Sequence, residues 1–254
     1  MRCPDCGFVQ MPTAHCKRCG GSLQTPFSTD PSSAETSFLT VQEKGKWVQP
    51  DWWAWVKTLL FYVQPRINPI AFYGRAALYV VLLVWGWQFI AMEYDKVVAG
   101  YPPINQSLMH SVNLVFHEAG HVIFMPFGRF VTILGGTLGQ WLIPFIVMCA
   151  FLLQTRDTFA ASFGLWWLGQ SFMDVAPYIN DARAGQLMLL GGVTGRDAPG
   201  YHDWENILRD LGWMQYDHTI AGIVDAIGVT LMVMSFLWGA YVLYLQYKNL
   251  DRGL

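Results

Sequence analysis

Long uncharged stretches dominate the pattern of hydrophobic and polar positions in this chain. Residues 76–92 and 130–154 contain no charged side chain, and residues 106–126 are apolar except for a few polar positions. Two further apolar stretches cover residues 158–173 and 219–247. Helices that cross the hydrocarbon core of a bilayer need about 20 such residues, so the pattern predicts an all-α polytopic membrane protein with about five transmembrane helices.

Three sections precede these stretches. Residues 1–21 hold four cysteines, and residues 22–46, rich in Ser, Thr, Pro and Gln, indicate a flexible linker. Residues 47–64 are too short and too polar to cross a membrane, and their tryptophans favour an amphipathic helix lying at the membrane interface. Residues 70–250 then form the transmembrane domain.

The composition agrees with a membrane location. Hydrophobic residues make up 53% of the 254 positions and charged residues 13%, where a soluble domain has about 25% charged residues. This excludes a secreted disulfide scaffold, a disordered chain and an ordinary cytosolic enzyme. The net charge of −2 argues against nucleic acid as a partner.

Four of the five cysteines form two C-x-x-C pairs, Cys3-Pro-Asp-Cys6 and Cys16-Lys-Arg-Cys19. Two such pairs with a short spacer predict a zinc ribbon in which four thiolates hold one structural Zn²⁺. A redox pair or disulfides are the alternatives. Thiols kept for a metal imply a reducing compartment, which favours a cytoplasmic N-terminus.

The distribution of basic residues predicts the same orientation. Eight of the sixteen Lys and Arg residues precede residue 76, whereas residues 93–105 contain only Lys96. The positive-inside rule then places the N-terminus in the cytoplasm, with the protein in the inner (cytoplasmic) membrane. Five crossings would leave Lys248 and Arg252 outside, and a re-entrant segment near 130–140 or 175–195 would change the count.

The segment His117-Glu118-Ala119-Gly120-His121 lies inside the second apolar stretch. Residues four apart share one face of a helix, so His117 and His121 can bind one zinc ion. Glu118 is offset by about 100° around the helix, beside the metal, where it can serve as the general base for water activation. Polar side chains that join helices are the alternative interpretation.

A catalytic zinc takes a third protein ligand and leaves one position open. Asp174 and Asp181 both lie near the end of an apolar stretch, and Pro177 between them predicts a break in the helix. We expect Asp181 to be the third ligand, with Asp174 as the alternative ligand or a supporting residue. Either side chain facing the cytoplasm is the competing interpretation.

These residues resemble the site-2 proteases, a family of intramembrane zinc metalloproteases. The likeness covers about residues 106–190 and includes HEAGH, the Gly-rich stretch 134–140 and an Asp-x-x-Pro…Asp element. Gln140 and Asp174 stand where the family has Asn, and Asp181-Ala182 replaces Asp-Gly. The resemblance implies a catalytic Zn²⁺ on two histidines and one aspartate, with Glu118 as base.

Two functions therefore compete. In the first, the chain is an intramembrane zinc endopeptidase that cleaves a transmembrane protein substrate, while the zinc ribbon binds a protein partner or controls access. In the second, the chain is a non-proteolytic subunit or scaffold of a larger membrane complex that retains a metal site.

Other polar residues carry weaker signals. His110 lies two turns before His117 on roughly the same face and is expected to bond to a neighbouring helix, with a proton relay as the alternative. Asn113 faces similarly and could hydrogen-bond either a substrate carbonyl or a neighbouring helix. Residues 201–208 predict a short amphipathic helix with Asp203 as a possible cap. His202 is expected at a surface or interface, with an approach to the metal as the alternative.

Overall fold

The computed structural model describes residues 52–98 and 100–251, together with His15, Cys19 and Gly20. Within this part of the chain the structure is helical, with isolated bridges but no strand. The α-helices are α1 (Trp52–Phe61), α2 (Pro69–Ala91), α3 (Leu108–Phe124), α4 (Arg129–Ala150), α5 (Thr158–Asn180), α6 (Asp203–Leu211) and α7 (Asp217–Lys248). Short turns of other helical types are η2 (Pro103–Gln106), η3 (Met125–Phe127), η4 (Phe151–Thr155) and η5 (Met214–Tyr216).

The chain divides into two compact units, Met1–Asp51 and Trp52–Leu254. Cys3, Cys6 and Cys16 lie outside the described residues, as does the linker at 22–46, and Cys19 is described as exposed. The zinc ribbon therefore stays a prediction, and the description below concerns the second unit.

Three described helical segments are long and apolar enough to cross a membrane: α2, Arg129–Thr155 and Met214–Lys248. They indicate a membrane protein, as the hydrophobic pattern predicted. The count of about five crossings stays a prediction. The helix at the start of this unit, α1, covers part of the expected interfacial helix and buries none of its residues.

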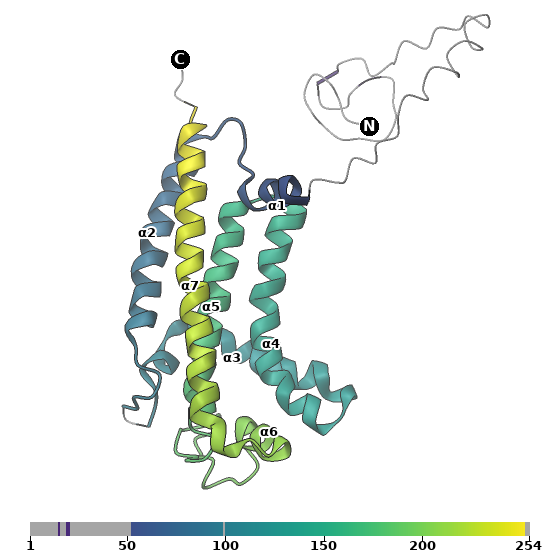
Figure 1. The fold of residues 1–254 in the computed structure, drawn as a ribbon, viewed down its shortest axis with the longest axis vertical. Helices are drawn as coiled ribbons and strands as arrows, with labels where there is room; N and C mark the ends of the chain where they lie inside the picture. The colour runs from purple at the N-terminus through teal and green to yellow at the C-terminus, as the bar shows by residue number, and fades with distance from the viewer. Residues whose placement is uncertain (1–14, 16–18, 21–51, 99, 252–254) are drawn as a thin grey trace, which may run out of the picture. The chain divides into compact units, whose positions relative to one another are not determined.

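Helix α5 lies between α4 and α7 and is the most buried helix of the bundle (Figure 1). Gly164 packs against the backbone of Met148 in α4, and Gly169 against the backbone of Met232 in α7. Small residues at such crossings let helix backbones approach closely, which is how helices associate in membranes. Because neighbouring helices surround α5, its surface does not need the apolar composition of a lipid-facing helix.

The two ends of the bundle can be followed from contacts between distant residues. The backbone of Ile67, just before α2, bonds to Asn249 just after α7. At the same end, Arg75 of α2 forms an ion pair with Asp157, the residue that caps the start of α5. Helices α2, α4, α5 and α7 therefore run between the same two ends, and the start of α2 and the end of α7 share one end (Figure 1).

The expected break at Pro177 is wrong. Helix α5 continues through Pro177 to Asn180, and α4 likewise continues through Pro144. A proline removes one backbone hydrogen bond from a helix, but packing on all sides of α5 holds the following turn in helical geometry. The backbone near Asp181 is therefore a helix end rather than an unwound segment.

Candidate metal centre

Glycines set the position of α3, the helix that carries the HEAGH segment. A Cβ atom at Gly120 would lie 2.1 Å from the carbonyl oxygen of Gly135 in α4, and one at Gly139 would lie 2.5 Å from the carbonyl oxygen of Phe116. The backbones of α3 and α4 are thus in direct contact, which only residues without side chains allow. The Gly-rich stretch of α4 is the surface on which the histidine helix packs.

His117 and His121 converge, as their spacing predicted, and a carboxylate meets them. Their ring centroids lie 4.9 Å apart, and Oδ2 of Asp203 lies 3.0 Å from Nε2 of His117 and 3.3 Å from Nε2 of His121. The three ligand atoms lie within 4.8 Å of one another. Ligands around a tetrahedral zinc with bonds of about 2.0–2.1 Å lie about 3.3–3.4 Å apart, so the two distances from Oδ2 of Asp203 are compatible with Zn²⁺.

Two features of α4 orient the imidazoles. Nδ1 of His121 lies 2.9 Å from the carbonyl oxygen of Thr132, which can only accept, so Nδ1 is the donor in this contact and Nε2 is the nitrogen that faces Asp203. A Cβ atom at Gly136 would lie 2.5 Å from Nε2 of His121 and 2.6 Å from Nε2 of His117. Any side chain at position 136 would therefore occupy the space beside both Nε2 atoms.

Helix α6 presents Asp203 to the histidines. His202 caps this helix, because its Nδ1 accepts the backbone N–H of Glu205. The backbone N–H of Asp203 donates to the hydroxyl of Tyr178, at 2.8 Å. Trp204 is buried in the core and donates its indole N–H to Thr137 of α4. The first turn of α6 is thus fixed against α4 and α5.

The Asp203 carboxyl is suited to bind a cation. Burial favours its neutral form, but hydrogen bonds from His117 and His121, together with their charges, outweigh burial and hold the pKa of Asp203 below its ordinary value. Asp203 therefore remains a carboxylate at neutral pH, which is the form that coordinates metals.

A cavity of about 720 Å³ adjoins the three ligand atoms. Glu118 lines it beside His117, His121 and Asp203, and the Glu118 side chain is exposed. Among the described residues, no hydrogen bond or ion pair engages the Glu118 carboxylate. A free carboxylate next to a metal site is the arrangement that general base catalysis needs.

The expected third ligands lie elsewhere. Asp181 accepts the backbone N–H groups of Gln186 and Leu187, both at 2.9 Å, and so shapes the loop that follows α5. Asp174 lines the same cavity but belongs to a separate polar cluster. Neither carboxylate joins the group formed by the two histidines. Asp203 of α6, rather than Asp181, is the carboxylate that meets His117 and His121.

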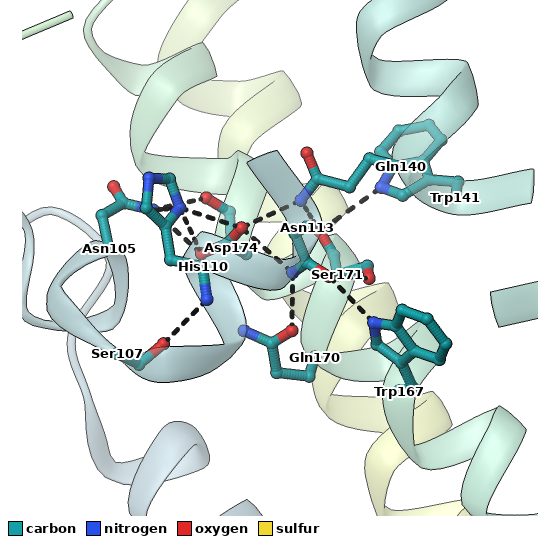
Figure 2. A network of polar contacts seen from close by, with 10 residues as sticks. All are labelled: Asn105, Ser107, His110, Asn113, Gln140, Trp141, Trp167, Gln170, Ser171 and Asp174. Atoms are coloured by element: carbon teal, nitrogen blue, oxygen red, sulfur yellow. Dashed lines mark hydrogen bonds and ion pairs between the residues drawn. The ribbon is translucent and has the colours of Figure 1, made fainter. Parts of the chain in front are cut away.

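Four side chains donate hydrogen bonds to Asp174, which is 3% exposed (Figure 2). Asn105, His110, Asn113 and Gln140 contribute them at 2.9–3.1 Å, from η2, α3 and α4. Because these donors occupy its oxygens, the carboxylate has no lone pair directed at a metal. Asp174 instead ties α5 to three neighbouring elements, and the expected bond from His110 to another helix is confirmed.

Sequence reasoning missed the role of Asp203 and misplaced His202. Residues 201–208 do contain a short helix, but its cap is His202, which is fully buried rather than at a surface. Asp203 lies 86 residues after His117, and no local spacing relates the two. Its position at the start of an amphipathic helix was the one available signal.

Comparisons with protein-family models, with curated proteins and with solved structures found no match for this chain. The resemblance to site-2 proteases therefore depends on the HEAGH segment and the elements around it.

Proposed function

We propose that this chain is an intramembrane zinc metalloprotease that cleaves membrane-embedded proteins. One observation carries the proposal: Nε2 of His117, Nε2 of His121 and Oδ2 of Asp203 meet within 4.8 Å at a cavity that Glu118 also lines. Two imidazoles and one carboxylate, with a carboxylate base beside them, form the donor set of hydrolytic zinc sites. Asp203 takes the place that the resemblance assigns to Asp181.

Each residue has a defined task in hydrolysis of an amide. A bound zinc ion would supply a Lewis acid and lower the pKa of a water molecule. Glu118 accepts a proton from that water as its oxygen forms a bond to the carbonyl carbon, and the carbonyl π electrons move to the carbonyl oxygen. When the carbon–nitrogen bond breaks, Glu118 returns the proton to the leaving nitrogen.

The surroundings of the site favour a substrate that lies in the membrane. Helix α3 exposes Val115, Val122 and Ile123, which would be costly in water and stable in lipid. The cavity volume of about 720 Å³ lies within the range of ligand pockets and leaves room for a short unwound stretch of polypeptide. Unwinding is required because the amides of a helix are hydrogen-bonded and shielded.

The proposal also includes the N-terminal section. A second, structural Zn²⁺ would be held by Cys3, Cys6, Cys16 and Cys19 in the cytoplasm, where the ribbon would bind a protein partner.

Cleavage of candidate single-span membrane proteins tests the enzyme function. Glu118→Gln should retain its metal and lose cleavage by at least about 100-fold, since a general base contributes about 10²–10⁴ in rate. Glu93→Gln is the matched control, because Glu93 pairs with Lys96 on the exposed surface, and should cleave as wild type does.

Metal analysis of the detergent-purified chain accompanies this assay. We expect two zinc ions, of which His117→Ala loses one and Cys16→Ala the other. Equal cleavage by wild type and Glu118→Gln, with both zinc ions present, would contradict the protease and favour the non-proteolytic subunit.

A further inference from the structure

Tyr178 lies beside the candidate metal centre, in contact with His117 and Asp203. It belongs to the last turn of α5 and lines the same cavity as Glu118. Its ring stands edge-on to that of His117, with centroids 6.3 Å apart, and stacks on His202 at 4.2 Å. The contacts with His117 and His202 therefore hold the ring of Tyr178 in one orientation.

The hydroxyl of Tyr178 accepts one hydrogen bond, and its own O–H donor is unused among the described residues. Its oxygen accepts the backbone N–H of Asp203 at 2.8 Å. The hydroxyl is therefore bonded to the same residue whose carboxylate meets the histidines. A phenol both accepts and donates, and within the part of the chain that the structure describes this hydroxyl donates to no acceptor. The side chain is half-buried at the cavity wall, so the cavity is the side from which an acceptor can approach.

We infer that Tyr178 is a further catalytic residue, whose hydroxyl donates a hydrogen bond to the scissile carbonyl oxygen as negative charge develops on it. This rests on the proposed function, since that charge arises only where an amide is hydrolysed. The donor is preorganised: the N–H of Asp203 fixes the oxygen, and the stack on His202 fixes the ring. A donor already in place stabilises the developing charge without reorganisation at the moment of reaction.

The inference distinguishes Tyr178 from a residue that only positions Asp203. Loss of a positioning contact would weaken metal binding and leave the metal-loaded site otherwise unchanged. Loss of a donor to the oxyanion would leave metal binding intact and weaken the affinity for an anionic oxygen beside the metal.

The test uses the full chain in detergent, loaded with Co²⁺, whose visible absorption reports its surroundings. Acetohydroxamate is titrated in, because its oxygens carry the negative charge that the carbonyl oxygen would acquire. Protein with His117→Ala, loaded in the same way, provides the blank for Co²⁺ bound at the cysteines. Neither step requires cleavage, so the result does not depend on finding a substrate.

Tyr178→Phe should bind Co²⁺ within about twofold of wild type and bind acetohydroxamate at least about tenfold more weakly, as expected for a lost hydrogen bond to a charged group. Tyr201→Phe is the matched control, because Tyr201 lines the same cavity and is exposed, and its affinity should not change. Unchanged acetohydroxamate affinity of Tyr178→Phe at saturating Co²⁺ would overturn the inference alone. Equal Co²⁺ spectra of wild type and His117→Ala would overturn the proposed metal site, and the inference with it.

Discussion

A single oxygen atom closes the candidate metal centre. Oδ2 of Asp203 contacts both imidazoles, whereas the histidines themselves belong to one helix and need only its periodicity to converge. A pair of histidines four residues apart is a weak chelator, and a third ligand from a distant element makes the site specific for a metal. The affinity for zinc should therefore depend most sharply on the residue at position 203.

Replacement of Asp203 by Asn tests this dependence. We expect the affinity for Zn²⁺ to fall by at least about 10–100-fold, since the loss of even an outer-shell contact to a metal ligand has an effect of this size. The measurement is competition with a chelator in a Cys16→Ala background, which removes the contribution of the ribbon.

Asp181→Asn is the control, because Asp181 binds backbone N–H groups of its own loop. Its zinc affinity should stay within about threefold of the parent chain, as expected for a residue outside the ligand set. Loss of zinc with Asp181→Asn and retention with Asp203→Asn would show that Asp181 is the third ligand, as the sequence predicted.

At the scale of elements, one buried carboxylate joins four segments of the bundle. Asp174 of α5 accepts hydrogen bonds from Asn105 of η2, from α3 and from α4 (Figure 2). Ion pairs and hydrogen bonds within a low-dielectric interior are strong when every partner is satisfied and costly when one is removed. The network therefore holds α3, which carries the two histidines of the candidate metal centre, against its neighbours.

Asp174→Asn should destabilise the bundle. The new amide group would present its own N–H bonds to donors such as Asn113 and Gln140, and leaving buried donors unsatisfied costs about 1–3 kcal/mol each. We expect the free energy of unfolding in detergent to fall by about 2–4 kcal/mol. Asp197→Asn, at an exposed loop position, should change it by less than about 1 kcal/mol.

An unfolding free energy for Asp174→Asn equal to that of Asp197→Asn would show that the network does not hold the elements together.

At the scale of the whole molecule, contacts between distant residues show which ends of the helices lie at the same end of the bundle. The pairing of Ile67 with Leu250 places the start of α2 beside the end of α7, so the chain returns to the end from which α2 sets out. Three of the four helices that run between the ends are apolar enough for lipid, and the fourth, α5, is enclosed by the others. Lys248 would then lie on the same side of the membrane as Arg66, in agreement with the positive-inside rule.

Labelling of introduced cysteines checks this topology. A membrane-impermeant maleimide should modify Arg66→Cys and Asp251→Cys from one side of the membrane and Asp95→Cys from the other, above the labelling of the parent chain. The reason is that positions 66 and 251 share one end of the bundle, because Ile67 bonds to Asp251, while position 95 follows α2 at the other end. Labelling of positions 66 and 251 from opposite sides would indicate an odd number of crossings.

Local patterns were enough to predict the helical membrane class, the presence of the helices from α2 to α7, and the convergence of His117 and His121. The start of α2 and the end of α5 each lie seven residues beyond the predicted apolar stretch. Each of these depends on hydrophobic length or on the helical repeat, which act between near neighbours in the chain. The identity of Asp203 as the third member of the His117–His121 group and the hydrogen-bonded role of Asp174 could not be inferred in this way. Asp203 reaches the histidines across 86 residues because α6 packs on α4 and α5, and only the tertiary structure decides such a contact.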